Sequence, residues 1–146
     1  MYVRDIKFRL WDKKYKRMIY QDGCCTFTIN GDGMVTIDAL NYAQITGEGY
    51  GWTRFTDNKK EVFEIMQFTG LQDSEGKDIY EGDIVEYQAS YDISFKSGIE
   101  TITEKCIVEY KKYGFTPFIN EREGSYTLSE FKVIGNKYEN PDIICQ

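Results

Sequence analysis

The sequence predicts an all-β protein in which N-terminal β-hairpins pack on a small, SH3-like C-terminal β-barrel. Aromatic residues make up 16% of the chain, with 12 tyrosines and 9 phenylalanines. Such side chains favour the pleated, half-buried surface of a sheet. Apolar and polar residues alternate in several short runs, which is the pattern of strands. The 13 glycines against 2 prolines suit a chain with many turns.

Composition indicates a globular chain. A length of 146 residues with 41% hydrophobic content is enough for a core. The formal net charge of -6 opposes long-range attraction to nucleic acid and favours solubility. No apolar run approaches the roughly 18 residues of a membrane span, and no signal segment opens the chain. We therefore expect a soluble, cytosolic protein with no membrane partner. We also expect two domains, an N-terminal β subdomain at 1–60 and the barrel at 61–146.

Two hairpins are predicted near the N-terminus. Ile6, Phe8 and Leu10 alternate with basic residues and place three apolar side chains on one face. The basic stretch 12–17 is the loop of this hairpin, and residues 18–20 pair back. The second hairpin turns at Asn-Gly, which accepts positive φ at low cost. Its strands have alternating apolar positions at Cys25, Phe27 and Ile29 before the turn, and at Val35, Ile37 and Ala39 after it.

Residues 40–60 are predicted to be a flexible connection, with a short helical turn at Leu40, Ala43 and Gln44. Glycines at 47, 49 and 51 loosen the chain. They form no GxGxxG phosphate loop, because Trp52 occupies the place of the third glycine.

Strands return in the C-terminal half. They are expected at 61–69, 79–80, 84–87, 106–110 and 115–119, with a short strand at 126–128 and a last one at 133–138. A polar loop is expected at 88–104, and one helical turn at 129–131 capped by Ser129. Pro117 must lie at an edge or bulge, because it donates no ladder hydrogen bond. This order of elements is that of an SH3-like barrel, with residues 88–104 as its long first loop.

Four acidic residues crowd one stretch, namely Asp73, Asp78, Glu81 and Asp83. In turns, aspartate accepts hydrogen bonds from backbone amides, and this is the role we expect for Asp83. The alternative is a carboxylate-based hydrolase. The chain has no histidine, the usual acid and base near neutral pH. Two of these carboxylates in one deep pocket, with raised pKa values, would support the hydrolase.

No metal or cofactor site is assigned. The cysteines, Cys24, Cys25, Cys106 and Cys145, form no CxxC pair. The acids at 30–38 lack the glutamate that closes an EF-hand loop. We therefore predict no cofactor and name no catalytic, cofactor-binding or metal-ligating residue.

Three segments resemble the YopX family of small phage and prophage proteins. They are RDIKFRLWDKKYKRMIY at 4–20, EIMQFTGLQDSEGKDIYEGDIVEY at 64–87 and FKVIGNKYENPDII at 131–144. The resemblance implies a phage-borne or prophage-borne gene in a bacterial host, an all-β fold and a cytoplasmic location. It implies no activity and carries no functional residues over.

The function we expect is that of a non-enzymatic binding module, with a host or phage protein as its partner and a possible homo-oligomer as its assembly. Candidate contact residues are the aromatic side chains Tyr91, Phe95, Tyr113 and Phe115. An alternative is single-stranded nucleic-acid binding, with basic residues from 13–17 and 105–112. An acidic mimic that occupies a host DNA-binding protein is a third possibility, and the net charge suits it.

Overall fold

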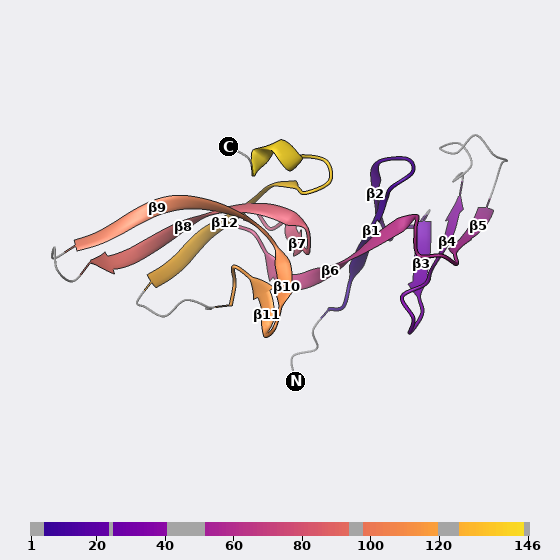
Figure 1. The fold of residues 1–146 in the computed structure, drawn as a ribbon, viewed down its shortest axis with the longest axis horizontal. Helices are drawn as coiled ribbons and strands as arrows, with labels where there is room; N and C mark the ends of the chain where they lie inside the picture. Colours follow the sequence, from indigo (N-terminus) through magenta and orange to yellow (C-terminus); the bar gives the residue numbers. More distant parts are fainter. Residues whose placement is uncertain (1–4, 24, 41–51, 94–97, 120–125, 145–146) are drawn as a thin grey trace. The chain divides into compact units, whose positions relative to one another are not determined.

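The computed structural model describes residues 5–23, 25–40, 52–93, 98–119 and 126–144, and within these ranges it has strands and one 3-10 turn but no α-helix (Figure 1). The all-β class is therefore confirmed. The strands are β1 (Phe8–Asp12), β2 (Arg17–Tyr20), β3 (Cys25–Ile29), β4 (Val35–Leu40), β5 (Trp52–Asp57), β6 (Phe63–Gln72), β7 (Asp78–Tyr80), β8 (Asp83–Ile93), β9 (Gly98–Ile107), β10 (Glu109–Lys111), β11 (Gly114–Thr116) and β12 (Tyr126–Asn136), followed by the 3-10 turn η2 (Pro141–Ile143).

The chain forms two compact units. One comprises residues 7–67, and the other comprises residues 1–6 and 68–146. Strand β6 contributes to both, since it pairs with β1 through Phe63 to Gln67 and with β7 through Phe68 and Gln72. The domain division at residue 60 stays a prediction.

In the unit of residues 7–67, the first hairpin has the expected pairing. Leu10 lies opposite Ile19, and both are buried. Asp12 at the end of β1 is fully buried and accepts hydrogen bonds at 3.0 Å from the amides of Lys14 and Tyr15, which fixes the loop. Ile6, expected on the strand, precedes β1 and is exposed, because its backbone has left the ladder.

The second hairpin, β3–β4, is confirmed, with Phe27 opposite Ile37. The Asn30 side-chain oxygen accepts from the amides of Asp32 and Met34, at 3.1 and 2.7 Å. Gly33 adopts a φ of 76°, a conformation that suits glycine. The reversal therefore forms where the sequence predicted it, but the positive φ is at Gly33 and not at the predicted Asn-Gly pair.

The prediction of a flexible connection at 40–60 is wrong at both ends. Leu40 ends β4, so it is not helical, and residues 52–57 form β5, which pairs along β4 from Val35–Asp57 to Leu40–Trp52. Ala43 and Gln44 lie outside the described residues. The glycines at 47, 49 and 51 suggested a flexible segment, whereas the β-branched and aromatic residues after them favour a strand.

These two sheets, β2-β1-β6 and β3-β4-β5, share an apolar core of Leu10, Ile19, Phe27, Val35, Ile37, Ala39 and Phe63. Asp57, at the end of β5, is buried and accepts from the amides of Glu61, Val62 and Phe63 at 2.8 to 3.1 Å. Burial alone would raise the pKa of Asp57, but these donors outweigh it and lower the pKa.

In the second unit, the prediction of a polar loop at 88–104 is wrong for residues 88–93 and 98–104, which are strand, and residues 94–97 lie outside the described residues. Strand β8 extends to Ile93, and β9 runs back beside it with an unbroken register from Ile84–Ile107 to Ile93–Gly98. The polar residues suggested a loop, but they form one face of a long hairpin. Gln88 bonds Thr103 at 3.0 Å, and Ser90 bonds Thr101 at 2.9 Å.

The helical turn expected at 129–131 is also wrong, since these residues lie inside β12, which pairs with β8. The register shifts between Ser129 and Lys132, and Glu130 has a φ of 57°. A β-bulge of this kind inserts an extra residue without ending the strand. Strand β6 likewise continues through Gly70, at a φ of 88°, to Gln72 rather than stopping at it.

Strands β12-β8-β9 form a curved sheet, and β10-β11 form a short hairpin (Figure 1). The strand expected at 115–119 is shorter than expected, because β11 ends at Thr116 and Pro117 leaves the ladder. The unit's core consists of Ile79, Val85, Tyr87, Ala89, Val108, Phe115 and Val133. With the expected loop and helical turn replaced by strand, the SH3-like order stays a prediction.

In the described part of the chain, no helix is long and apolar enough to cross a membrane.

Candidate functional site

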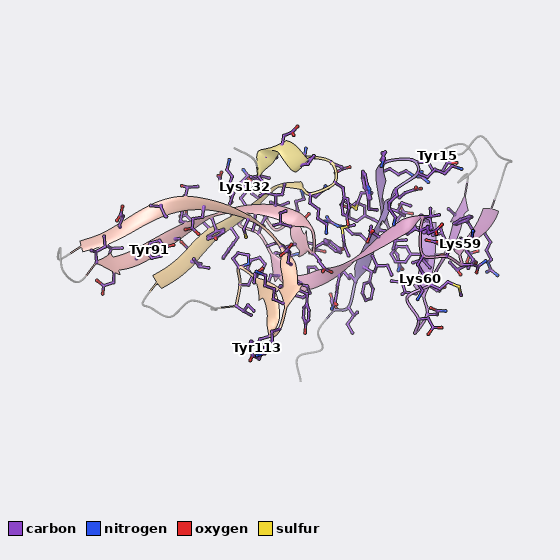
Figure 2. All side chains as sticks on the ribbon, in the orientation of Figure 1. Tyr15, Lys59, Lys60, Tyr91, Tyr113 and Lys132 are labelled. Atoms are coloured by element: carbon purple, nitrogen blue, oxygen red, sulfur yellow. The ribbon has the colours of Figure 1, made fainter. Side chains whose placement is uncertain are left out.

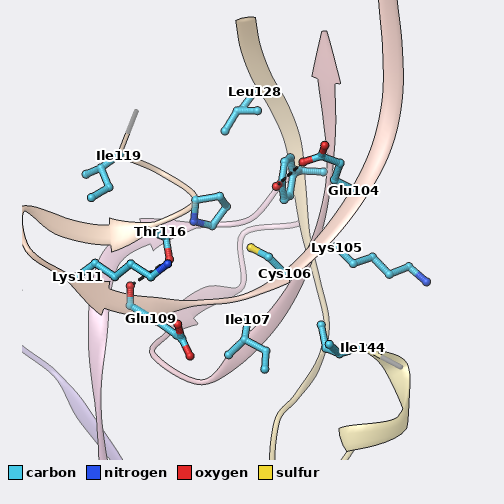
Figure 3. Close-up of a pocket in the computed structure, with 12 residues that line it drawn as sticks. Glu104, Lys105, Cys106, Ile107, Glu109, Lys111, Thr116, Ile119, Leu128 and Ile144 are labelled. Atoms are coloured by element: carbon cyan, nitrogen blue, oxygen red, sulfur yellow. Dashed lines mark hydrogen bonds between the residues drawn. The ribbon is translucent and has the colours of Figure 1, made fainter. Parts of the chain in front are cut away.

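The second unit contains a groove lined in part by β9, β11 and β12. It consists of two adjacent pockets of about 520 and 500 Å³ that share Pro117 and Leu128. We call their combined lining the inner groove, and Figure 3 shows the side chains of the first pocket. It is formed by Leu71, Gln72, Tyr87, Glu104, Lys105, Cys106, Ile107, Glu109, Lys111, Thr116, Pro117, Phe118, Ile119, Thr127, Leu128, Phe131 and Ile144.

Aromatic rings form one wall of the inner groove. The Phe131 ring centroid lies 5.2 Å from that of Tyr87 and 4.8 Å from that of Phe118, both in tilted arrangements. Phe131 reaches these rings from the bulged part of β12, and Phe118 lies in the turn that follows β11. The bulge thus aims an apolar side chain at the groove, as bulges near functional sites commonly do.

A carboxylate lies beside this wall. Glu104 on β9 accepts hydrogen bonds from the hydroxyls of Tyr87, at 2.8 Å, and Tyr91, at 2.9 Å. Both tyrosines come from β8, where alternate residues share a face. Tyr87 and Glu104 are also direct cross-strand partners. The groove therefore combines apolar rings with a negative group held in a fixed orientation.

Cys106 lies among the side chains that line the first pocket of the inner groove (Figure 3). Burial raises the pKa of this thiol to about 11, and the nearby carboxylates of Glu104 and Glu109 act in the same direction. A hydrogen bond with Tyr87 and the charge of Lys111 lower the pKa, but they do not outweigh the burial.

We expect Cys106 in the native protein to react with iodoacetamide at pH 8 about a hundredfold more slowly than a free thiol, because only the thiolate attacks. Peptide mass spectrometry after timed labelling measures this residue separately from the other cysteines. The same labelling in denaturant gives the free-thiol rate. Native labelling as fast as the denatured control would contradict a buried, protonated thiol.

Three comparisons with known proteins bear on this fold. The profile of the family described as YopX protein matches residues 7–144. This chain belongs to the YopX family. The match covers both compact units and most of the inner groove. A search of curated proteins gives no match.

Solved structures show the same fold for this YopX-family chain. The crystal structure of protein EF1440 from Enterococcus faecalis has a TM-score of 0.57 and 24% identity, over 97% of this chain and 99% of that one. The crystal structure of protein yopX from Bacillus subtilis has a TM-score of 0.59 and 19% identity, over 96% and 98%.

The clustered carboxylates of this YopX-family protein lie in turns or directly beside them: Glu81 is in a turn, Asp73 precedes one, and Asp78 and Asp83 begin β7 and β8. Asp83 is buried, and its Oδ2 accepts from the amide of Tyr80 at 2.8 Å, so the structural role predicted for it is confirmed. Asp78 accepts from the Gln72 side chain at 2.9 Å. None of Asp73, Asp78, Glu81 and Asp83 lines either pocket described here.

Asp73 is the most connected of these acids. It accepts from the amides of Glu75 and Lys77, both at 2.9 Å, and from Val133 on β12 at 3.0 Å. Burial would raise the pKa of Asp73, but the three amide donors, Val133 foremost, lower it overall. A lowered pKa is the opposite of the raised value that the hydrolase alternative needs.

The four aromatic contact candidates have different positions. Phe115 is part of the core, and Tyr91 is half-buried with its hydroxyl on Glu104. Tyr113 is 74% exposed, at the tip of the β10–β11 hairpin (Figure 2). Phe95 lies outside the described residues. The candidates therefore do not form one patch.

The basic segments are also separate. Within 13–17, Lys13 pairs with Glu64 at 3.2 Å and Arg17 with Asp12 at 3.6 Å. Within 105–112, Lys105 lies 3.9 Å from Glu86, and Lys112 lies over the Tyr113 ring. The first segment belongs to the unit of residues 7–67 and the second to the other unit.

Cys25 and Cys106 lie in different units, and Cys24 and Cys145 lie outside the described residues. Among the described residues, no group of three or more His, Cys, Asp or Glu could hold a metal ion.

Sequence reasoning did not find the groove residues Leu71, Phe118, Leu128 and Phe131. Residues 129–131 were predicted to form a helical turn capped by Ser129, whereas they form a bulge in β12, and Leu128 and Phe131 both line the groove. Leu71 could have been found, since it is an apolar residue directly before a turn and is 44% exposed.

Proposed function

We propose that this YopX-family chain is a non-enzymatic binding module that holds a segment of a protein partner in the inner groove. The observation that carries this proposal is the pair of adjoining pockets that share Pro117 and Leu128. Together they combine apolar and aromatic side chains with charged ones, Glu104, Lys105, Glu109 and Lys111, and such a mixture can both bury and orient a bound segment.

The side chains that would anchor the partner are the apolar ones that remain exposed or half-buried at the groove. Leu71 and Ile144 are large apolar residues that remain exposed at the groove, at 44% and 38%. Phe118 and Phe131 are half-buried beside them. Burying such side chains against a partner supplies most of the energy in typical protein interfaces.

Family membership adds the biological setting of the proposal. Because the YopX family consists of phage and prophage proteins, we propose that the gene is phage-borne or prophage-borne. Its product would act on a host or phage protein in the bacterial cytoplasm. The family match over residues 7–144 supports this setting, and the binding role rests on the groove.

Leu71→Asp tests the groove. The substitution introduces a charge among apolar groove side chains at an exposed position, so the fold should tolerate it. The matched control is Ser74→Asp, which adds the same charge at an exposed position of the following turn, outside the groove lining. Tagged versions are expressed in the bacterial host with the phage, and proteins that co-purify are quantified by mass spectrometry.

We expect a partner that wild type and Ser74→Asp recover equally and that Leu71→Asp recovers at least about tenfold less. Equal recovery by all three versions, or no partner at any salt, would count against the proposal. Retention of single-stranded DNA or RNA in a low-salt filter assay would favour the nucleic-acid alternative, for which the exposed tip with Tyr113 and Lys112 is the plausible contact.

A further inference from the structure

We propose that the outer edge of β9 takes up an extended, basic segment of the partner as an additional strand. The inference rests on the proposed function and names the chemistry of the partner. It depends on three features of β9: its position in the sheet, the direction of its amides and the side chains of its two faces.

Strand β9 is an edge strand. The order of the sheet is β12-β8-β9, so β9 pairs with β8 on one side, and no strand among the described residues pairs with it on the other. Every residue from Gly98 to Thr103 is exposed. At ten residues, β9 is long for an unprotected edge, and such an edge is a template for another strand.

The register shows which backbone groups face outward. The amide of Val108 donates to the carbonyl of Asp83, and the carbonyl of Val108 accepts from the amide of Gly82, both at 2.8 Å, so both backbone groups of Val108 face the β8 side, as in a hydrogen-bonded pair. The register continues without a shift along the whole of β8 and β9. In an antiparallel ladder such pairs alternate with pairs that do not exchange bonds. Even-numbered residues of β9 therefore bond to β8, whereas the amides of residues 99, 101, 103 and 105 point to the open edge.

The side chains of β9 favour a particular partner. Glu100, Ile102 and Glu104 alternate along the face that carries Tyr87 and the groove. A strand added at the edge would place its own alternate side chains opposite these three. The added strand would complement them if it carried a positive, an apolar and a positive side chain at these successive positions. Ile99, at 77% exposed, and Ile102, at 40%, add apolar surface on opposite faces of the same edge.

Charge supports a basic segment. The unit of residues 1–6 and 68–146 contains 16 of the 24 acidic residues but 9 of the 18 basic ones, so its formal charge is -7. Lys105 on the other face of β9 is close to Glu86 at 3.9 Å, which offsets its charge. A field of this sign attracts a cationic strand and repels an acidic one.

The probe is a fluorescent peptide, TKTITKTITK, whose alternate positions carry lysine and isoleucine on one face and threonine on the other. Its control, TETITETITE, has the same β-propensity and the opposite charge. Binding of each peptide to the full chain is measured by fluorescence anisotropy at low salt. The key variant is Thr101→Pro, which removes one outward amide without removing a bond to β8. Thr101→Ala loses the same hydroxyl bond to Ser90 and keeps the amide.

We expect the lysine peptide to bind wild type and Thr101→Ala within about twofold of each other, and Thr101→Pro at least about tenfold more weakly. The glutamate peptide should not bind. Circular dichroism of Thr101→Pro serves as the control for folding. The variant Ile99→Glu should bind the lysine peptide slightly more tightly than wild type does, because the added negative charge lies on the same edge of β9.

The inference would be overturned if both peptides bind equally, if the lysine peptide does not bind, or if Thr101→Pro binds the lysine peptide as well as wild type does. A wild-type dimer that becomes a monomer in Thr101→Pro would also overturn it, because a second copy of the chain would then cover the edge. The groove is tested separately. If Leu71→Asp loses the co-purified partner and Thr101→Pro keeps it, the proposed function stands and the edge inference fails.

Discussion

Replacing Asp73 with alanine is expected to lower the free energy of unfolding by about 2 to 3 kcal/mol. The side chain is buried and accepts three backbone amides, from Glu75, Lys77 and Val133. Two of these close the turn between β6 and β7, and the third ties this turn to β12, 60 residues further along the chain. Alanine leaves all three donors without this acceptor, and each such loss costs about 1 kcal/mol.

Urea denaturation followed by circular dichroism measures the effect. The matched control is Glu75→Ala in the same turn, which removes an exposed ion pair with Lys132 at 2.7 Å and should cost less than about 0.5 kcal/mol. Asp73→Asn retains one acceptor oxygen and should fall between the two. A cost below about 1 kcal/mol for Asp73→Ala would show that the turn does not depend on this carboxylate.

The same bonds predict a pH dependence. The pKa of Asp73 is lowered in the folded state, as is that of Asp57. A carboxyl whose folded pKa lies below its unfolded value stabilises the protein above the unfolded value, about 3.9, and this stabilisation is lost as pH falls through the folded pKa. Wild type should therefore lose stability below about pH 4, and Asp73→Asn should lose less over that range.

Ile37→Ala is expected to lower the free energy of unfolding by about 3 to 4 kcal/mol. Ile37 is fully buried in the core of the unit formed by residues 7–67, on the central strand β4, opposite Phe27 and Phe55. The alanine removes three carbons and leaves a cavity on a strand that is held from both sides. A central strand cannot shift to fill it without breaking two ladders.

The control is Ile37→Val, which removes one methylene and should cost about 1 kcal/mol. Hydrogen exchange with mass spectrometry localises the effect. Peptides from 25–29, 35–40 and 52–57 should lose protection first, because these strands form the sheet of Ile37. A uniform loss of protection across both units would indicate that their cores unfold together. If Ile37→Ala lowered the free energy of unfolding by no more than Ile37→Val does, tight packing around Ile37 would be contradicted.

The sequence alone determined the elements whose chemistry is local. The Asn30 turn, the first hairpin and the amide-binding role of Asp83 each depend on side chains within a few residues of the backbone that they hold. Family membership could also be recognised from contiguous segments that belong to the profile matched at 7–144. Alternation predicted the strands β3 and β4 because one face of each is buried and the other is not.

Only the tertiary structure decided where polar strands lie and where the inner groove forms. Residues 88–104 look like a loop because their polarity is satisfied across strands, by pairs such as Gln88–Thr103, and no local pattern records a partner 15 residues away. Phe131 meets Tyr87 and Phe118 through a bulge and two strand pairings. A pocket is made of surfaces that are distant in the chain, so its shape depends on packing that periodicity and turn residues leave open.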